Sequence, residues 1–132
     1  MIFNYNYEIN IKKIFNLTNL KRLSILDFGC GTGIWPSKNL DKKINEIILY
    51  DNNKKLLFFL KKKYKNKNVK INFNLNKIIK NKNYNIILLS SVIQYISKSD
   101  LRKIIYKLTK NKKKIFIVIT DIPYLPRFIE FI

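Results

Sequence analysis

Short uninterrupted hydrophobic runs alternate along the chain with segments whose hydrophobic residues recur every three or four positions. The runs predict strands buried on both faces at residues 23–28, 47–50, 86–89 and 115–119. Residues 69–74 alternate hydrophobic and polar side chains, which predicts a half-exposed edge strand. The periodic segments predict helices over residues 8–20, from about 36 to 43, after residue 52 and around 101–108.

This alternation of strands and helices predicts an α/β fold with a Rossmann-like, doubly wound parallel sheet and right-handed crossovers. Because the edge strand is the third in the chain, the expected strand order is 3-2-1-4-5. We expect one domain over residues 1–132, with a leading helical segment at 1–21, a core at 22–123 and the start of a further element at 124–132. In the helix after the capping residue Asn52, the expected core side is formed by Leu56, Leu57, Phe59 and Leu60.

The composition gives the chain a strong positive charge, which can reflect either genome composition or binding to an anionic partner. The net charge is +19, but the chain has 24 Lys against 3 Arg, 18 Asn and 24 Ile, and no Ala or His. This bias is typical of an AT-rich genome, and a phosphate-binding surface more often uses the arginine fork. The lysine runs at 61–70, 77–82 and 110–114 precede strands, which predicts that they lie opposite a ligand site. Nucleic acid is therefore a possible partner but not the favoured one.

Other features of the composition set the expected compartment. The chain has no run long enough for a membrane span and no signal-peptide pattern at its start. Cys30 is the single cysteine, which excludes an internal disulfide and fits a cytoplasmic protein. With no histidine and one cysteine, we expect no metal site, and Cys30 lacks the usual activating base and is interpreted as a packing residue.

All three glycines of the chain lie within five residues, directly after the first strand. Gly29, Gly31 and Gly33 predict a turn at which a ligand contacts bare backbone, at the carboxyl end of a parallel strand. Asp51 ends the second strand, 22 positions after Gly29, where a carboxylate accepts hydrogen bonds from ribose hydroxyls. Ser90 begins a polar segment after the fourth strand, at the same expected crevice.

These motifs, in this order, resemble the class I S-adenosylmethionine-dependent methyltransferases. The matching stretches are ILDFGCGTG at 25–33, LYD at 49–51 and SSVIQYI at 90–96, so the resemblance covers most of the chain. A nicotinamide dinucleotide site requires a glycine where this chain has Ile34, and no Gly-Lys-Ser/Thr sequence follows for a P-loop. The resemblance implies S-adenosylmethionine as the methyl donor and an expected acceptor that is a small molecule, lipid or sugar derivative.

The resemblance also implies roles for individual residues. The three glycines, with Cys30 between them, support the methionine part of the donor, and Asp27 orients the loop and the donor's amino group. Asp51 holds the ribose, and Asn52 lies beside the adenine. The remaining candidates are Asn76 for the adenine amino group, and Ser90 and Ser91 facing donor or acceptor, with Gln94 and Tyr95 nearby. No general base is identified; Trp35 is interpreted as a core residue and Asp121 as a turn residue.

The resemblance leaves a question of completeness. The family usually has two strands beyond the fifth, whereas this chain ends at residue 132. A free hydrophobic edge at residues 115–119 predicts a dimer or a second chain that covers it. The alternatives to a small-molecule methyltransferase are a truncated or non-catalytic cofactor-binding module, and an RNA methyltransferase.

Overall fold

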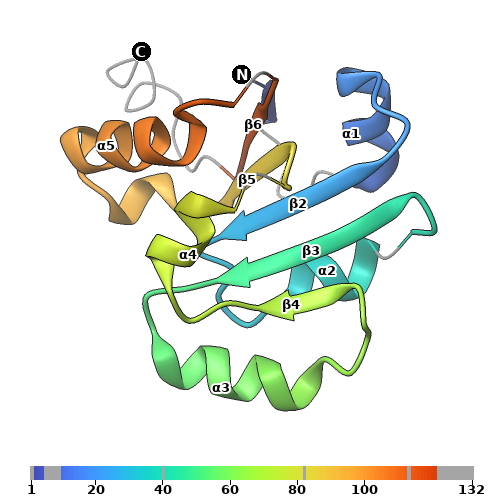
Figure 1. Ribbon diagram of the computed structural model, residues 1–132, viewed down its shortest axis with the longest axis horizontal. Coiled ribbons are helices and arrows are strands. Elements are labelled where there is room, and N and C mark those ends of the chain that lie inside the picture. Colours follow the sequence, from blue (N-terminus) through green and yellow to red (C-terminus); the bar gives the residue numbers. More distant parts are fainter. Residues whose placement is uncertain (1, 5–9, 40, 82, 113, 122–132) are drawn as a thin grey trace.

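Six parallel strands form one sheet with helices packed on both faces (Figure 1). The structure is a computed structural model, and it describes residues 2–4, 10–39, 41–81, 83–112 and 114–121. The strands are β1 (Ile2–Asn4), β2 (Leu23–Phe28), β3 (Ile44–Tyr50), β4 (Val69–Ile71), β5 (Ile86–Ser90) and β6 (Phe116–Thr120). The helices are α1 (Ile11–Thr18), α2 (Ile34–Asn39), α3 (Lys54–Lys63), α4 (Leu75–Lys80), α5 (Lys98–Thr109) and the short 3-10 helix η1 (Ile93–Tyr95).

The sheet confirms the predicted fold and strand order. The five predicted strands correspond to β2 to β6, and their order β4-β3-β2-β5-β6 is the expected 3-2-1-4-5. The central strand β2 is buried at every position, which explains why four of its six residues are hydrophobic and do not alternate with exposed polar ones. Because β2 lies between β3 and β5, the turn after Phe28 opens at the point where the strand order reverses.

A sixth strand, which the sequence analysis missed, covers the outer edge of β6. Its three residues pair in parallel, with Ile2 opposite Val118 and Asn4 opposite Thr120. The expectation of a free edge on the fifth predicted strand is therefore wrong. The prediction of a dimer or second chain was based on that free edge, so it loses its basis. Within the leading segment at 1–21, the structure contains the predicted helix as α1 and, in addition, the strand at residues 2–4. The element expected at 124–132 lies outside the described residues.

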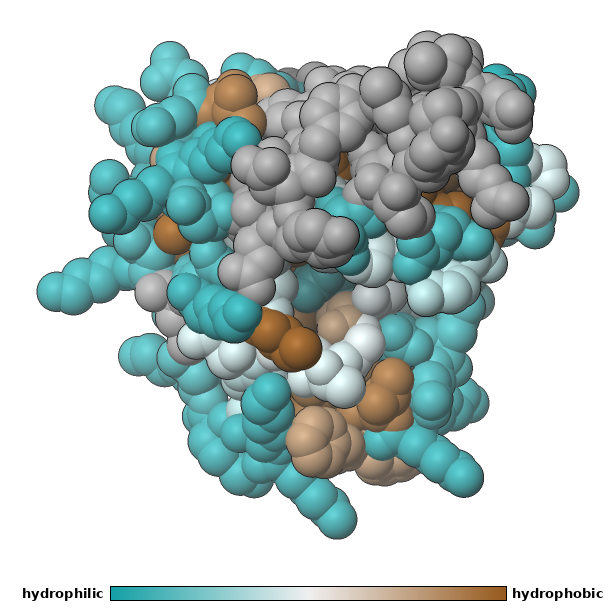
Figure 2. All heavy atoms as spheres, turned by 180° about the vertical axis from the view of Figure 1, so that it is seen from behind, coloured by the Kyte–Doolittle hydropathy of each residue, from teal (hydrophilic) through white to brown (hydrophobic). Residues whose placement is uncertain are grey.

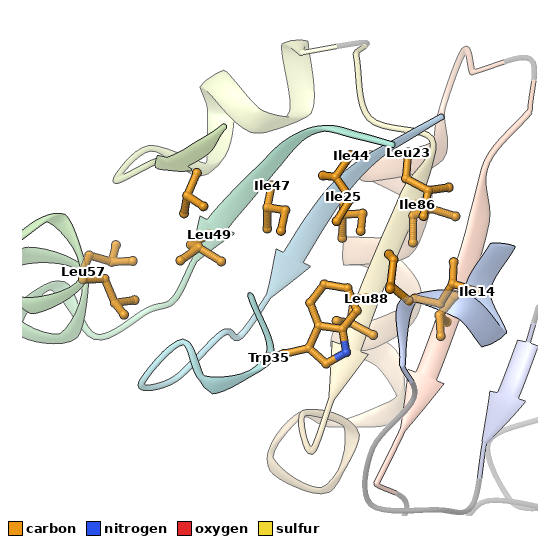
Figure 3. Packing of buried hydrophobic residues seen from close by; sticks show 14 residues of the cluster. Ile14, Leu23, Ile25, Trp35, Ile44, Ile47, Leu49, Leu57, Ile86 and Leu88 are labelled. Atoms are coloured by element: carbon orange, nitrogen blue, oxygen red, sulfur yellow. The ribbon is translucent and has the colours of Figure 1, made fainter. Parts of the chain in front are cut away.

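Two hydrophobic clusters hold the layers together, one on each face of the sheet. The first joins α1, α2 and α3 to the sheet, and Figure 3 shows 14 of its residues, with Ile14, Trp35, Leu57 and Leu88 among those labelled. The second joins α4, η1 and α5 to the other face, with Ile78, Ile93, Leu101 and Leu108 among its members. The core role expected for Trp35 is thus confirmed, since its side chain is 9% exposed.

The helices differ from the predictions in three respects. The core side of α3 is formed by Leu57 and Leu60, whereas Phe59 is 53% exposed, so its predicted core position is wrong. Asn53 caps α3 in place of Asn52, and its side chain accepts hydrogen bonds from the first turn. The strand predicted at 69–74 ends at Ile71, because Asn74 caps the unpredicted helix α4. Among the described residues, no helix has the length and hydrophobicity needed to cross a membrane.

Candidate functional site

A cleft of about 500 Å³ opens at the carboxyl ends of β2, β3 and β5. Eight of the ten residues predicted for the site line it: Asp27, Gly29, Cys30, Gly31, Asp51, Asn52, Ser90 and Ser91. Gly33 is buried just behind the loop, and Asn76 is an exposed residue of α4 that does not line the cleft. The volume falls in the range of ordinary small-molecule sites, roughly 300–1,000 Å³.

All three glycines of the loop have a positive φ, but they differ in the space that a side chain would have at each position. A Cβ atom on Gly29 would lie 2.5 Å from Cγ2 of Val92, and one on Gly33 would lie 2.6 Å from Cδ2 of Leu60. A Cβ atom on Gly31 would have no neighbour within 4 Å. Gly29 and Gly33 are therefore needed for packing, whereas Gly31 leaves bare backbone facing open space, as a bound ligand requires.

The second strand holds this loop in place through backbone and side-chain contacts. The N–H groups of Gly29 and Cys30 both donate to the carbonyl oxygen of Tyr50, at 2.8 and 3.0 Å. Asp51 accepts a hydrogen bond from the Gly31 N–H at Oδ2 (3.0 Å) and one from the Asn53 N–H at Oδ1 (2.8 Å). Asp51 therefore fixes both the glycine loop and the start of α3, and each of its oxygens can accept a further hydrogen bond.

Asp27 is a buried carboxyl group beneath the loop. It is 2% exposed, and it lines the cleft. Burial, and secondarily the charge of Asp51, raises the pKa of Asp27 to about 7. Burial also raises the pKa of the Cys30 thiol, with smaller contributions from Asp27 and Asp51, so this cysteine is a neutral packing residue. The cleft thus contains an acidic group suited to a cationic partner.

A second hollow of about 170 Å³ adjoins the cleft, between α2 and the ends of β5 and β6. Its lining residues include Ile34, Trp35, Ser90 and Ser91, which also line the cleft. At its other side, the Ser91 hydroxyl donates to Oδ2 of Asp121. The sequence analysis treated Asp121 as a turn residue, and it does have a positive φ. Its position at the carboxyl end of a strand, on the same edge as Ser90, was the signal for a site residue.

The rim of the cleft includes residues that the sequence analysis named without a defined role, or not at all. Tyr95 in η1 is 81% exposed and lines the cleft, whereas Gln94 does not. Ile34 is 55% exposed and lines both hollows. Lys63, from a lysine run expected on the opposite side of the sheet, donates from Nζ to the carbonyl oxygen of Thr32 at 3.3 Å. For Lys63, the predicted placement away from the site is wrong.

Comparison with known proteins agrees with this geometry. A family model for a methyltransferase domain matches residues 25–114, which is more than half of the chain. A curated relative, ribosomal RNA small subunit methyltransferase A of Mesomycoplasma hyopneumoniae (strain 232), is 38% identical over 60 residues. That match covers 46% of this chain and 23% of the relative, so the chain spans about a quarter of the relative's length.

A solved structure has the same fold. The methyltransferase domain of bacterial CtHen1-CN superposes with a TM-score of 0.59 at 17% sequence identity. The superposition covers 79% of this chain and 58% of that one. The chain therefore shares its fold with a known methyltransferase domain, and at this sequence identity the similarity concerns the fold alone.

Proposed function

The chain belongs to the methyltransferase domain family, and on that premise we propose that its cleft binds S-adenosylmethionine and transfers the methyl group to an acceptor. The observation that carries this proposal is the open backbone at Gly31. A Cβ atom there would meet no atom within 4 Å, and Asp27 and Asp51 place two carboxyl groups in the lining of the same cleft. This arrangement matches a ligand with an ammonium group and a ribose.

Different residues of the cleft would contact different parts of the donor. The Gly29–Gly33 loop would support the amino-acid part of the donor, and the buried carboxyl group of Asp27 would interact with its ammonium group. Asp51 has free lone pairs for the ribose hydroxyls, because its two backbone contacts use one lone pair on each oxygen. Asn52 lines the cleft, and it would lie beside the adenine. An adenine contact by Asn76 remains a prediction from the sequence, and its position on α4 gives it no support.

We assign the second hollow to the acceptor. When bound, S-adenosylmethionine supplies an electrophilic methyl group on a good leaving group. The chain's own contribution is to align the acceptor and to remove its proton where the nucleophile carries one. Ser90 and Ser91 connect the cleft to the hollow, and Asp121 is the carboxylate within it. Held by the Ser91 hydroxyl, Asp121 is the candidate proton acceptor that the sequence analysis did not identify.

Two acceptor classes fit this hollow. Its volume of about 170 Å³ suits one ring system, as in the small molecule or sugar derivative expected from the sequence. The same space suits a nucleobase turned out of a strand, as enzymes that act on bases require. The net charge of +19 and the rRNA methyltransferase among the relatives favour RNA as the second candidate.

Calorimetry with S-adenosylmethionine and S-adenosylhomocysteine tests the cofactor assignment. We expect both to bind, and Asp51→Ala to weaken binding at least about tenfold, the effect of losing a charge-assisted contact worth on the order of 1.5–3 kcal/mol. Asp51→Asn is the matched variant, because an amide oxygen still accepts one of the two backbone hydrogen bonds. It should retain the fold and lose affinity.

The opposite outcomes are clear. Tight binding of NAD without binding of S-adenosylmethionine refutes the assignment. Binding of both ligands without methyl transfer to RNA or to small hydroxyl and amine compounds supports the alternative, a cofactor-binding module without catalysis. Incubation with methyl-labelled donor and fractionation of the product into RNA and small molecules distinguishes the two acceptor classes.

A further inference from the structure

The outer face of α3 combines exposed aromatic rings with lysines. Phe58 is 59% exposed and Phe59 is 53% exposed. Residues four positions apart on a helix lie one above the other, about 6 Å along its axis. Each ring therefore has a lysine one turn before it and one turn after it. The two rows are Lys54–Phe58–Lys62 and Lys55–Phe59–Lys63, and we call these six residues the α3 Lys–Phe face.

The fold does not require this composition. The core side of α3 is supplied by Leu57 and Leu60, both 0% exposed, and Asn53 caps the helix. The ten residues of α3, KKLLFFLKKK, include no acidic residue, so the lysines have no opposite charge on their own helix. Phe58 contacts the ring of Phe73, with centroids 4.9 Å apart, which fixes its orientation. Adjacent exposed rings of this kind indicate a contact surface.

The α3 Lys–Phe face borders the cleft at both ends of the helix. α3 begins at Lys54, two residues after Asn52, which lines the cleft. At the other end, Lys63 donates to the carbonyl oxygen of Thr32, which also lines the cleft. Figure 2 shows light-brown hydrophobic side chains between hydrophilic ones at the lower edge of the molecule, where α3 lies in Figure 1. A chain lying along α3 therefore reaches the cleft without crossing another layer.

We propose that the α3 Lys–Phe face docks a single-stranded nucleic acid, with bases stacked on Phe58 and Phe59 and phosphates contacted by the lysines. Interleaved aromatic and cationic side chains are the common means of binding single strands without reading sequence. The proposal rests on the proposed function and selects its nucleic-acid acceptor. A membrane surface fits less well, because Leu57 and Leu60 are buried and the exposed hydrophobic surface is concentrated in two adjacent rings, which form no long hydrophobic stripe along α3.

Fluorescence anisotropy with labelled oligo(U) RNA, and with oligo(dT) DNA as a second arm, tests this proposal. Phe59→Leu removes the aromatic ring but keeps a hydrophobic side chain, and it should weaken binding of either strand by about fivefold or more. The Lys55→Gln/Lys62→Gln pair should reduce the slope of log K against log salt by about 1.4, since each lost phosphate contact on a single strand contributes about 0.7.

Helix α5 provides matched controls on the other face of the sheet. Tyr106 is 62% exposed and has Lys110 over its ring at 5.8 Å, so Tyr106→Leu removes an equivalent exposed ring. Lys103→Gln/Lys107→Gln removes the same charge as the α3 pair. We expect the affinity of Tyr106→Leu and the salt slope of the α5 pair to equal those of the unaltered chain.

Four results overturn the docking proposal: no effect of Phe59→Leu, equal effects of the α3 and α5 lysine pairs, no binding of either oligonucleotide, or binding to anionic phosphatidylglycerol vesicles alone. S-adenosylhomocysteine binding is measured in parallel on each variant. If that ligand binds and Phe59→Leu has no effect on RNA, the docking surface is refuted while the proposed function stands. If that ligand fails to bind the unaltered chain, the proposed function itself fails.

Discussion

At the scale of single residues, folding favours the protonated form of the Asp27 side chain, whereas binding of an ammonium group favours the ionised form. Its pKa in the folded chain, about 7, lies above the ordinary value of 3.8. Between these two values the folded state keeps a proton that the unfolded chain has released. The free energy of unfolding therefore falls as the pH rises from 3.8 to about 7, and the loss is complete above that window. An ammonium ligand would favour the ionised form instead.

The variant Asp27→Asn distinguishes the effect of Asp27 on stability from its effect on ligand binding. An amide of the same shape cannot ionise, so we expect the variant to be more stable than the unaltered chain at pH 8 and to lose the fall in stability toward pH 7. The variant should bind S-adenosylhomocysteine more weakly, and binding to the unaltered chain should strengthen as the pH rises through 7. Urea titrations and calorimetry at pH 6 and pH 8 provide the measurements. A variant that is less stable at pH 8 contradicts the role of burial in the pKa of Asp27.

A second residue-scale prediction concerns two glycines of the loop, because Gly31 faces open space whereas Gly29 packs against Val92. Gly31→Ala strains a positive φ at a cost of about 1–2 kcal/mol, but its methyl group meets no atom of the chain. Gly29→Ala adds a collision with Val92 to the same strain. We expect Gly31→Ala to remain folded and to lose ligand affinity, and Gly29→Ala to lose more free energy of unfolding. Chemical denaturation and calorimetry compare the two, and equal losses of stability would argue against the packing role of Gly29.

At the scale of elements, β1 determines whether the hydrophobic strand β6 is paired on both sides. Deletion of residues 2–4 removes the pairing with Val118, Ile119 and Thr120 and exposes the edge of β6. We expect the shortened chain to associate as its concentration rises, while the full chain at equal concentration associates less. Multi-angle light scattering measures this directly. Equal masses for the two chains would show that β1 does not protect the edge.

The pattern of elements explains which parts were predictable from the sequence. Strands buried on both faces are uninterrupted hydrophobic runs, so β2, β3, β5 and β6 and their order followed from periodicity. The strand β1 has three residues and α4 has six, too few for a period to stand out. The candidate site depended on the same logic. Asp27 and Asp51 end strands at one edge and were predicted to line it, whereas the start of α4 placed Asn76 outside the cleft.

The exposure of single helix faces was less predictable. Phe58 and Phe59 are adjacent in α3, and five hydrophobic residues in a row fit more than one choice of buried face. Packing against the sheet selects Leu57 and Leu60 and leaves both rings in solvent. Asp121 has a similar explanation, because an aspartate before Ile122–Pro123 is typical of a turn, and its contact with Ser91 depends on the alignment of β5 and β6.

At the scale of the whole molecule, positive charge is poorly balanced. The chain has 27 basic and 8 acidic residues, and the described part contains the ion pairs Lys70–Glu46 and Lys103–Asp100. Repulsion among like charges destabilises a compact state, and salt screens charges that are farther apart than the Debye length, about 10 Å at 0.1 M. The melting temperature should therefore rise with salt, whether the lysines arose from genome composition or from selection for binding.

We expect the melting temperature to increase by a few degrees when NaCl is raised from about 20 to about 200 mM, because screening relieves repulsion in the folded state more than in the expanded one. Circular dichroism melts provide the measurement. The quadruple variant Lys55→Gln/Lys62→Gln/Lys103→Gln/Lys107→Gln serves as the control, since its lower charge should give a smaller increase on the same scale. A melting temperature that falls with salt would mean that attractive contacts outweigh repulsion, and that the lysines stabilise the fold in addition to providing a surface for anionic partners.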